Sequence, residues 1–129
     1  MVGIVLVSHS NKIAEGIKEV SLQMASQAKI AAAGGTRDER IGTDVNKILE
    51  AIQSVYSEDG VIILFDLGSS CMNAEMAIEF LDPDKQNKVE IVDAALVEGA
   101  IVAAVESTLN KNITEIKNSI KSTNLPKRA

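Results

Sequence analysis

Apolar runs alternate with helix-like periodicities along this chain. Val2–Val7 and Val61–Phe65 are continuous apolar runs rich in β-branched residues, as is typical of strands buried on both faces. Val89–Val92 predicts a shorter strand of the same kind. Lys29–Ala33, which two glycines follow, predicts another strand, although its alanines also suit a helix.

Between these runs, apolar residues recur at three- and four-residue steps, which predicts helices with one buried face each. Thr43 stands where the N-cap of one of them is expected, and Asp82-Pro83-Asp84 has the turn chemistry that ends another. The predicted faces are Ile13, Ile17, Val20 and Met24; Val45, Ile48, Leu49, Ile52 and Val55; Met72, Met76 and Phe80; Val97, Ile101, Ala104 and Val105 within Ala94–Leu109; and Ile113, Ile116 and Ile120.

Strands that alternate with helices need crossover connections, which favour parallel pairing. We therefore predict an α/β fold: an open, mainly parallel four-stranded sheet with helices on both faces. A chain of 129 residues without repeats or a linker forms one domain. This domain spans residues 1–129, with a C-terminal helix and tail over 110–129.

Composition narrows the function classes. The net charge of −5 argues against a nucleic-acid binder, which needs clustered basic residues, and Lys127–Arg128 suits a frayed terminus. No apolar run reaches the roughly 20 residues of a membrane span, and Met1–Val7 lacks the basic leader of a signal peptide. The single cysteine, Cys71, leaves no internal disulfide and, with the methionines, is expected in an aliphatic core. We expect a cytoplasmic protein.

Small and polar residues follow the predicted strands. Because ligands bind beyond the carboxyl ends of parallel strands, we expect these residues to form one polar pocket. The segments are Ser8-His9-Ser10-Asn11, Gly34-Gly35-Thr36, Asp66-Leu67-Gly68-Ser69-Ser70, and Asp93.

His9, the only histidine, is the main candidate for chemistry. A neutral imidazole is a competent nucleophile toward phosphorus. An ordinary histidine here would cap the following helix or bond a neighbour. Its place at a strand end, between two hydroxyls and before a helix, favours a carrier of a phosphoryl group.

Each residue expected near His9 has two possible roles. Asp66 either fixes the tautomer of the imidazole or caps the helix that begins near Ser69. Gly34, Gly35 and Thr36 either offer N–H groups and a hydroxyl to phosphate or form a plain turn. The same two readings apply to Gly68, Ser69 and Ser70, whose place at a helix N-terminus favours an anion site.

Other chemistries match the sequence less well. It has no P-loop motif and no dinucleotide fingerprint after the first strand. One His and one Cys cannot make a usual zinc site, so we expect no metal and no bound cofactor. His9, Asp66 and Ser70 could form a hydrolase triad, but the segment around Ser70 does not match G-x-S-x-G. A response-regulator receiver would need paired acidic residues after the first strand, where this chain has Ser-His-Ser.

Four segments together resemble a known family: GIVLVSHS, AAGGT, IGT before a helix, and DLGSSCMNAEMA. They are similar to the phosphotransfer subunit of bacterial dihydroxyacetone kinase, the DhaM family. Its first domain is similar to enzyme IIA of the mannose branch of the sugar phosphotransferase system. The resemblance runs from Met1 to about Leu109.

The resemblance implies a phosphohistidine at His9 that HPr supplies. The phosphoryl group then passes to ADP on a partner kinase subunit, and ultimately to dihydroxyacetone. The resemblance also implies a homodimer, which we expect to involve the Ala94–Leu109 helix or its neighbours. The alternatives are an enzyme IIA of a mannose-type sugar transporter and a non-catalytic regulatory or binding domain of the same fold.

The resemblance departs at one position. In the mannose branch, the aspartate that partners the histidine aligns with Phe65, one residue before Asp66. One residue along a strand turns a side chain to the other face, so the contact between His9 and Asp66 does not follow from the resemblance.

Overall fold

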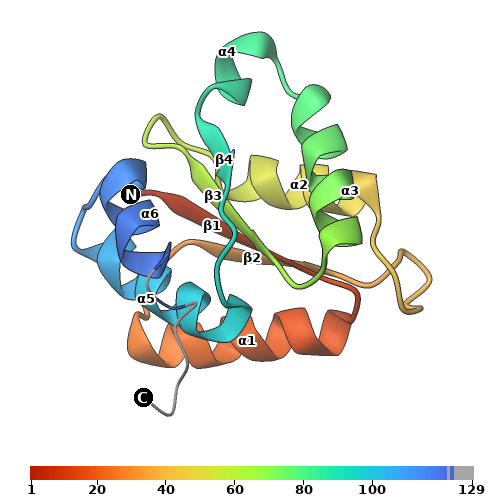
Figure 1. Cartoon of the computed structure of the whole chain (residues 1–129), viewed down its shortest axis with the longest axis horizontal. Coiled ribbons are helices and arrows are strands. Elements are labelled where there is room, and N and C mark those ends of the chain that lie inside the picture. Colours follow the sequence, from red (N-terminus) through yellow and green to blue (C-terminus); the bar gives the residue numbers. More distant parts are fainter. Residues whose placement is uncertain (122, 124–129) are drawn as a thin grey trace.

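A single four-stranded parallel sheet forms the centre of the protein (Figure 1). The computed structural model describes residues 1–121 and residue 123; Lys127–Arg128 and most of the predicted tail lie outside the described residues. The strands are β1 (Gly3–Ser8), β2 (Ile30–Gly34), β3 (Val61–Phe65) and β4 (Val89–Ile91), in the order β2-β1-β3-β4. This arrangement confirms the predicted fold class, including the strand at Lys29–Ala33.

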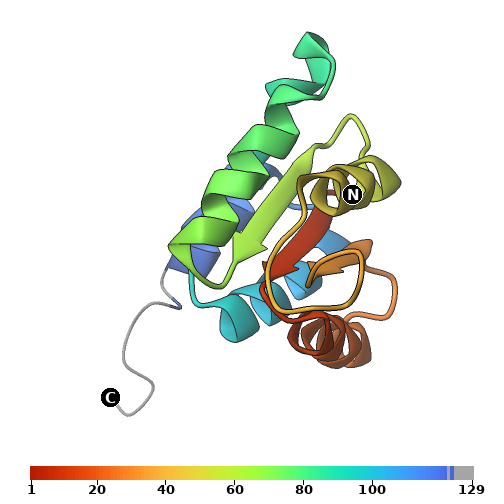
Figure 2. The ribbon, with the colours of Figure 1, turned by 90° about the vertical axis from the view of Figure 1, so that its right-hand side faces the viewer.

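Helices cover both faces of the sheet (Figures 1 and 2). One face packs against α1, α5 and α6, and the other against α2 and α3. Among the described residues, no helix is long and apolar enough to cross a membrane. The helices are α1 (Asn11–Met24), α2 (Val45–Val55), α3 (Gly68–Glu79), α4 (Pro83–Gln86), α5 (Leu96–Thr108) and α6 (Ile113–Lys121).

The central strands divide the core into two halves. Successive side chains of a strand point to opposite faces, so Ile4 and Leu6 of β1 enter the half under α1 and α5. Val5 and Val7 enter the half under α2 and α3. All four side chains are fully buried, which explains why β1 is apolar throughout rather than alternating.

Two of the predicted helix faces are largely correct. Ile48, Ile52 and Val55 of α2 are buried, as are Ile116 and Ile120 of α6. The N-cap of α2 is Asp44 rather than Thr43, because the Asp44 carboxylate accepts the N–H of Lys47 at 2.9 Å.

The predicted face of α3 is wrong, and those of α1 and α5 are correct only in part, since Ile17 of α1 and Ala104 of α5 are buried as expected. Most side chains that these three helices bury are small, whereas several larger apolar side chains are exposed, and small side chains let a helix backbone approach the sheet closely. The buried residues are Ala14, Ile17 and Ser21 on α1; Ser70, Ala74 and Ala77 on α3; and Gly99, Ala100, Ala103, Ala104 and Ser107 on α5. The exposed residues are Ile13, Val20, Met24, Met72, Met76, Phe80 and Val97.

Two further expectations need correction. Cys71 is only partly buried and three of the methionines, Met24, Met72 and Met76, are exposed, so these residues are not core. Asp82-Pro83-Asp84 does not form a simple turn. Asp82 is instead the N-cap of the short helix α4, in which Pro83 takes the first position, where its missing N–H costs nothing.

Candidate functional site

The carboxyl ends of the two central strands bring His9 and Asp66 together. Val7 of β1 pairs with Phe65 of β3, and the Asp66 N–H donates to the Val7 carbonyl at 3.2 Å. The residues that follow each strand therefore meet at the same edge of the sheet. Asp66 lies just past the last residue of β3, where side chains no longer alternate between the two faces of the sheet. Its side chain can therefore reach His9.

Asp66 accepts hydrogen bonds at both carboxylate oxygens. Its Oδ2 accepts the His9 N–H at 2.9 Å and the Ser8 hydroxyl at 3.0 Å. Its Oδ1 accepts the Leu67 N–H at 2.7 Å and the Ser70 hydroxyl at 2.6 Å. None of these bonds caps the first turn of α3, whose N-cap is Leu67 without a side-chain bond. Between the two readings of Asp66, the structure favours the partner of His9.

These bonds keep the Asp66 carboxyl ionised. Partial burial by itself raises the pKa of Asp66, but the hydrogen bonds from Ser70, from the backbone and ring of His9 and from Ser8 outweigh it. Together they lower the pKa from 3.8 to about 2. Asp66 is therefore an anion at neutral pH and can only accept hydrogen bonds.

The orientation of the imidazole follows from that anion. Nδ1 of His9 lies 3.1 Å from Asp66 Oδ1 and 3.0 Å from the Ser70 hydroxyl. The nitrogen that faces a carboxylate carries the hydrogen, so the lone pair of the neutral ring lies on Nε2. The hydroxyl of Ser69 is 2.7 Å from Nε2 and donates to that lone pair.

The start of α3 adds hydrogen-bond donors beside Nε2. The first N–H groups of a helix have no acceptor within the helix, and in α3 these belong to Gly68 and Ser69. The N–H groups of Ser70 and Cys71 donate to the Leu67 carbonyl. A negatively charged group on Nε2 would therefore meet the positive end of this helix and the Ser69 hydroxyl.

The Gly34-Gly35-Thr36 segment does not offer the free donors that we expected. The Gly35 N–H donates to the Ser8 carbonyl at 3.1 Å and the Thr36 N–H to the Arg40 carbonyl at 3.0 Å. The Thr36 hydroxyl donates to Asp38 at 2.6 Å. These groups stabilise the chain itself, which corrects their expected role as phosphate ligands.

Steric constraints explain why glycine stands at positions 34 and 35. A Cβ at Gly34 would lie 2.5 Å from the Ser10 carbonyl oxygen, and Gly35 has a φ of +70°, which is costly for other residues.

Ser10 is the N-cap of α1. Its hydroxyl accepts the Ile13 N–H at 3.3 Å, and its own N–H donates to the Ser8 hydroxyl at 3.1 Å. Asp93, at the end of β4, is exposed and lies near Cys71. Burial, the hydrogen bond to Glu75 and the charges of Glu75 and Asp93 raise the pKa of that thiol.

Three contacts escaped the sequence analysis. Ser8 is fully buried and ties Asp66 to the Ser10 N–H; its position next to His9 was the available signal. The Gly42 N–H donates to the His9 carbonyl at 2.8 Å, and the Asn73 amide donates to the Thr43 hydroxyl. These two bonds fix the segment 36–44 beside His9, and no pattern in the sequence predicts them.

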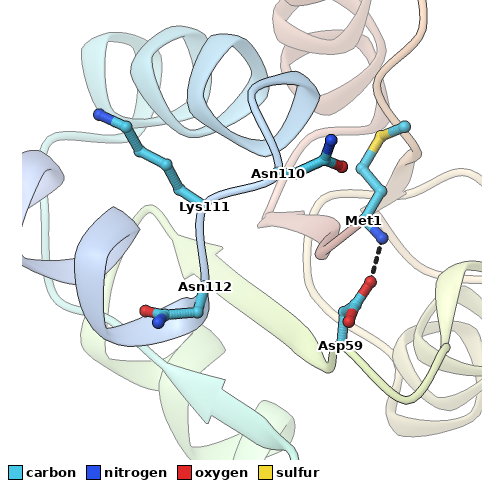
Figure 3. Close-up of a pocket in the computed structure, with 5 residues that line it drawn as sticks. All are labelled: Met1, Asp59, Asn110, Lys111 and Asn112. Atoms are coloured by element: carbon cyan, nitrogen blue, oxygen red, sulfur yellow. Dashed lines mark hydrogen bonds and ion pairs between the residues drawn. The ribbon is translucent and has the colours of Figure 1, made fainter.

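Two hollows lie at opposite ends of the sheet. One, of about 360 Å³, adjoins His9 and is lined by residues 10–12 and 39–41. The other, of about 150 Å³, lies at the amino ends of the strands (Figure 3). There the Met1 ammonium pairs with Asp59, opposite Asn110, Lys111 and Asn112. The second hollow contains no residue of the predicted site.

Comparisons with known proteins identify relatives of this chain. The sequence model of the family EIIA-man, "PTS system fructose IIA component", matches residues 3–117. A Listeria innocua protein named PEP-dependent dihydroxyacetone kinase 2, phosphoryl donor subunit DhaM, is 43% identical over 111 residues, which cover 85% of this chain and 89% of the relative.

The DhaM subunit of Providencia stuartii is 41% identical over 122 residues, 92% of this chain; the chain spans only 26% of that longer relative. The crystal structure of a protein of unknown function is 35% identical, covers 98% of both chains and superposes with a TM-score of 0.87.

Proposed function

Because the chain belongs to the EIIA-man family, the fructose IIA components of the phosphotransferase system, we propose that it is the phosphoryl carrier of a phosphotransferase-dependent dihydroxyacetone kinase. Two relatives at 41% and 43% identity carry the name of the phosphoryl donor subunit of that kinase. In this role the chain accepts a phosphoryl group on His9 from phospho-HPr. It then passes the group to ADP held by the partner kinase subunit, for the phosphorylation of dihydroxyacetone.

The observation that carries the proposal is the oriented imidazole. Nδ1 faces the ionised Asp66 at 3.1 Å, and Nε2 faces outward to the Ser69 hydroxyl at 2.7 Å. With 23% of the His9 side chain exposed, an incoming phosphorus atom can approach Nε2 in line.

The transfer follows from these contacts. The Nε2 lone pair forms a bond to phosphorus while the bond from phosphorus to the donor histidine nitrogen breaks, and that donor nitrogen keeps the electron pair. The ring of His9 gains positive charge, which Asp66 stabilises through Nδ1–H. The Ser69 hydroxyl turns from Nε2 to a phosphoryl oxygen, and the N–H groups of Gly68 and Ser69 add donors.

The second transfer reverses these events. A terminal oxygen of ADP attacks phosphorus, the bond from phosphorus to Nε2 breaks, and the ring returns to its neutral state. Two anions meet in this step, so a metal ion or basic groups supplied by the kinase subunit would offset their charge. The carrier itself binds no cofactor in this scheme and works in the cytoplasm.

We propose a homodimer as well, but not through the small residues of α5. Those residues are buried within one chain by packing on the sheet, α1 and α6. Helix α3 exposes Met72 and Met76, and its C-cap residue Phe80 is also exposed, so that three apolar side chains follow one another at four-residue steps along one side of the helix. Apolar side chains of this size gathered on one helix face are typical of an interface.

Transfer between purified proteins tests the proposal. The chain is incubated with phospho-HPr, and its mass is measured before and after addition of the ADP-loaded kinase subunit. We expect one acid-labile phosphoryl group on the native chain, none on the His9→Ala variant, and rapid loss of the group to ADP. A native chain that gains no phosphoryl group would identify a non-catalytic binding domain and refute the proposal.

A second candidate is the enzyme IIA of a mannose-type sugar transporter, which the description of the matching family favours. It shares the phosphohistidine and differs in the acceptor. This alternative would be established by a phosphorylated chain that does not transfer its phosphoryl group to the ADP-loaded kinase subunit but transfers it to the IIB component of such a transporter.

A further inference from the structure

The hollow of about 360 Å³ next to the backbone of His9 is lined by neither Ser69 nor any other residue of α3. Its walls are the first turn of α1, through Ser10, Asn11 and Lys12, and the segment Glu39, Arg40 and Ile41. Ser10 follows His9 directly, and the Gly42 N–H is bonded to the His9 carbonyl. Both walls are therefore fixed to the backbone of the phosphoryl acceptor.

Apolar side chains are exposed at this hollow. Ile41, in its wall, is 78% exposed, and Ile13, one residue beyond the other wall, is 51% exposed. Neither side chain contributes to the buried core. Large aliphatic groups beside a reacting histidine are the kind of contact that a docking protein buries.

The charge of the hollow differs from that of the chain. Lys12 and Arg40 line it with a single acidic residue, Glu39, whereas the chain has a net charge of −5. Arg40 pairs with Asp38 at 2.8 Å, but both side chains are more than half exposed. An ion pair so exposed is weak, so the guanidinium can turn to an anion brought by a partner.

We propose that this hollow is the docking site of the nucleotide-loaded kinase subunit. Ile13 and Ile41 contact apolar side chains of that subunit, and Lys12 and Arg40 face the diphosphate of its nucleotide. The inference rests on the proposed function and adds to it the surface that receives the acceptor.

The position of the basic side chains favours the acceptor over the donor. The phosphoryl group that is transferred sits on Nε2, beside Ser69 and the start of α3, and both transfers use those groups. Only the acceptor brings further phosphates. Lys12 and Arg40 line the hollow, whereas Ser69 is the residue that faces Nε2, so the two basic side chains are free to complement such additional charge.

Paired variants at the two ends of the sheet test the proposal. Ile41→Ser and Lys12→Gln change the hollow. Leu109→Ser and Lys111→Gln are the matched controls, because Leu109 is 62% exposed and both residues lie at the opposite end of the sheet. Three quantities are measured: the rate of labelling by phospho-HPr, the rate of label loss to a limiting ADP-loaded kinase subunit, and the Kd of the unphosphorylated chain for that subunit.

We expect Ile41→Ser and Lys12→Gln each to slow label loss and raise the Kd at least about fivefold, as truncation of an interface anchor does. Labelling by phospho-HPr should stay within about twofold, and the controls should match the native chain throughout, because they lie outside the proposed interface.

Unchanged label loss and Kd in the two hollow variants would overturn the inference. An equal slowing of labelling by phospho-HPr would also overturn it, since the hollow would then receive the donor. A native chain that binds the kinase subunit but does not transfer would refute the proposed function, while a raised Kd in the variants would still support the docking site. Failure of the native chain to bind would refute both.

Discussion

Replacement of Asp66 by Asn tests the hydrogen-bond network that orients His9. The Asn side chain has the size of the carboxylate but lacks its charge. Hydrogen bonds hold the pKa of Asp66 at about 2 instead of 3.8, and each pH unit corresponds to about 1.4 kcal/mol. The folded protein therefore favours the ionised carboxylate by about 2 kcal/mol, and Asp66→Asn should lower the free energy of unfolding by about that amount at pH 7.

The pH dependence gives the sharper form of this prediction. Because the pKa of Asp66 is lower in the folded state, its stabilisation is fully present above the unfolded value of 3.8. It is lost as the pH falls through about 2. The difference in stability between the native chain and Asp66→Asn should therefore shrink from about pH 5 downward and approach zero near about pH 1, since the other carboxyls titrate in both proteins.

Urea unfolding followed by far-UV circular dichroism is the appropriate assay, because the chain has no tryptophan. The midpoint and slope are measured for both proteins at several pH values across that range. A difference below about 0.5 kcal/mol at pH 7, the usual size of a surface substitution, would refute the network. A difference that does not change with pH would refute the role of ionisation.

The remaining predictions concern two glycines, a serine and the nucleotide. Gly16→Ala should raise the free energy of unfolding by up to about 1 kcal/mol, because Gly16 lies within α1 and an added Cβ meets no atom within 4 Å. Gly35→Ala should lower the free energy of unfolding by about 1–2 kcal/mol, because Gly35 has a φ of +70°. A Gly35→Ala variant that is more stable in urea unfolding would contradict this backbone geometry. Ser70→Ala removes a buried hydroxyl that donates to Asp66 and should cost about 1–3 kcal/mol; an unchanged urea midpoint would show that this bond contributes nothing. The phosphorylated chain alone should not phosphorylate free ADP and Mg²⁺ at a useful rate, and fast loss of label without the kinase subunit would reveal a nucleotide site on this chain.

The fold could be predicted from the sequence because its strongest patterns are local. The run Val61–Phe65 matches β3 residue for residue, and continuous β-branched segments between helical periods leave little besides a parallel sheet. The helix faces were harder. On α1 the spacing of the large apolar residues predicts a buried face of Ile13, Ile17, Val20 and Met24. The structure buries only Ile17 of these, together with the small residues Ala14 and Ser21, which allow the helix to lie close to the sheet.

The site was predictable only in part, because the sequence does not show which hydrogen bonds the folded chain already makes. Parallel strands must bring their carboxyl ends to one edge, so a meeting of the segments around His9 and Asp66 could be expected. Which hydrogen bonds are already used inside the chain could not be, since it depends on backbone geometry. The Gly35 N–H is satisfied by the Ser8 carbonyl, whereas Ser69, a residue with the same two readings, faces Nε2.

NMR identification of the phosphorylated nitrogen of His9 is the sharpest test of the proposed phosphoryl carrier. The chain has a single histidine, so labelling histidine with ¹⁵N gives NMR signals from this one ring. After phosphorylation by phospho-HPr, we expect coupling to phosphorus at Nε2, with Nδ1 still protonated and hydrogen-bonded to Asp66. Coupling at Nδ1, or a ring that gains no phosphorus, would refute the proposed role of His9.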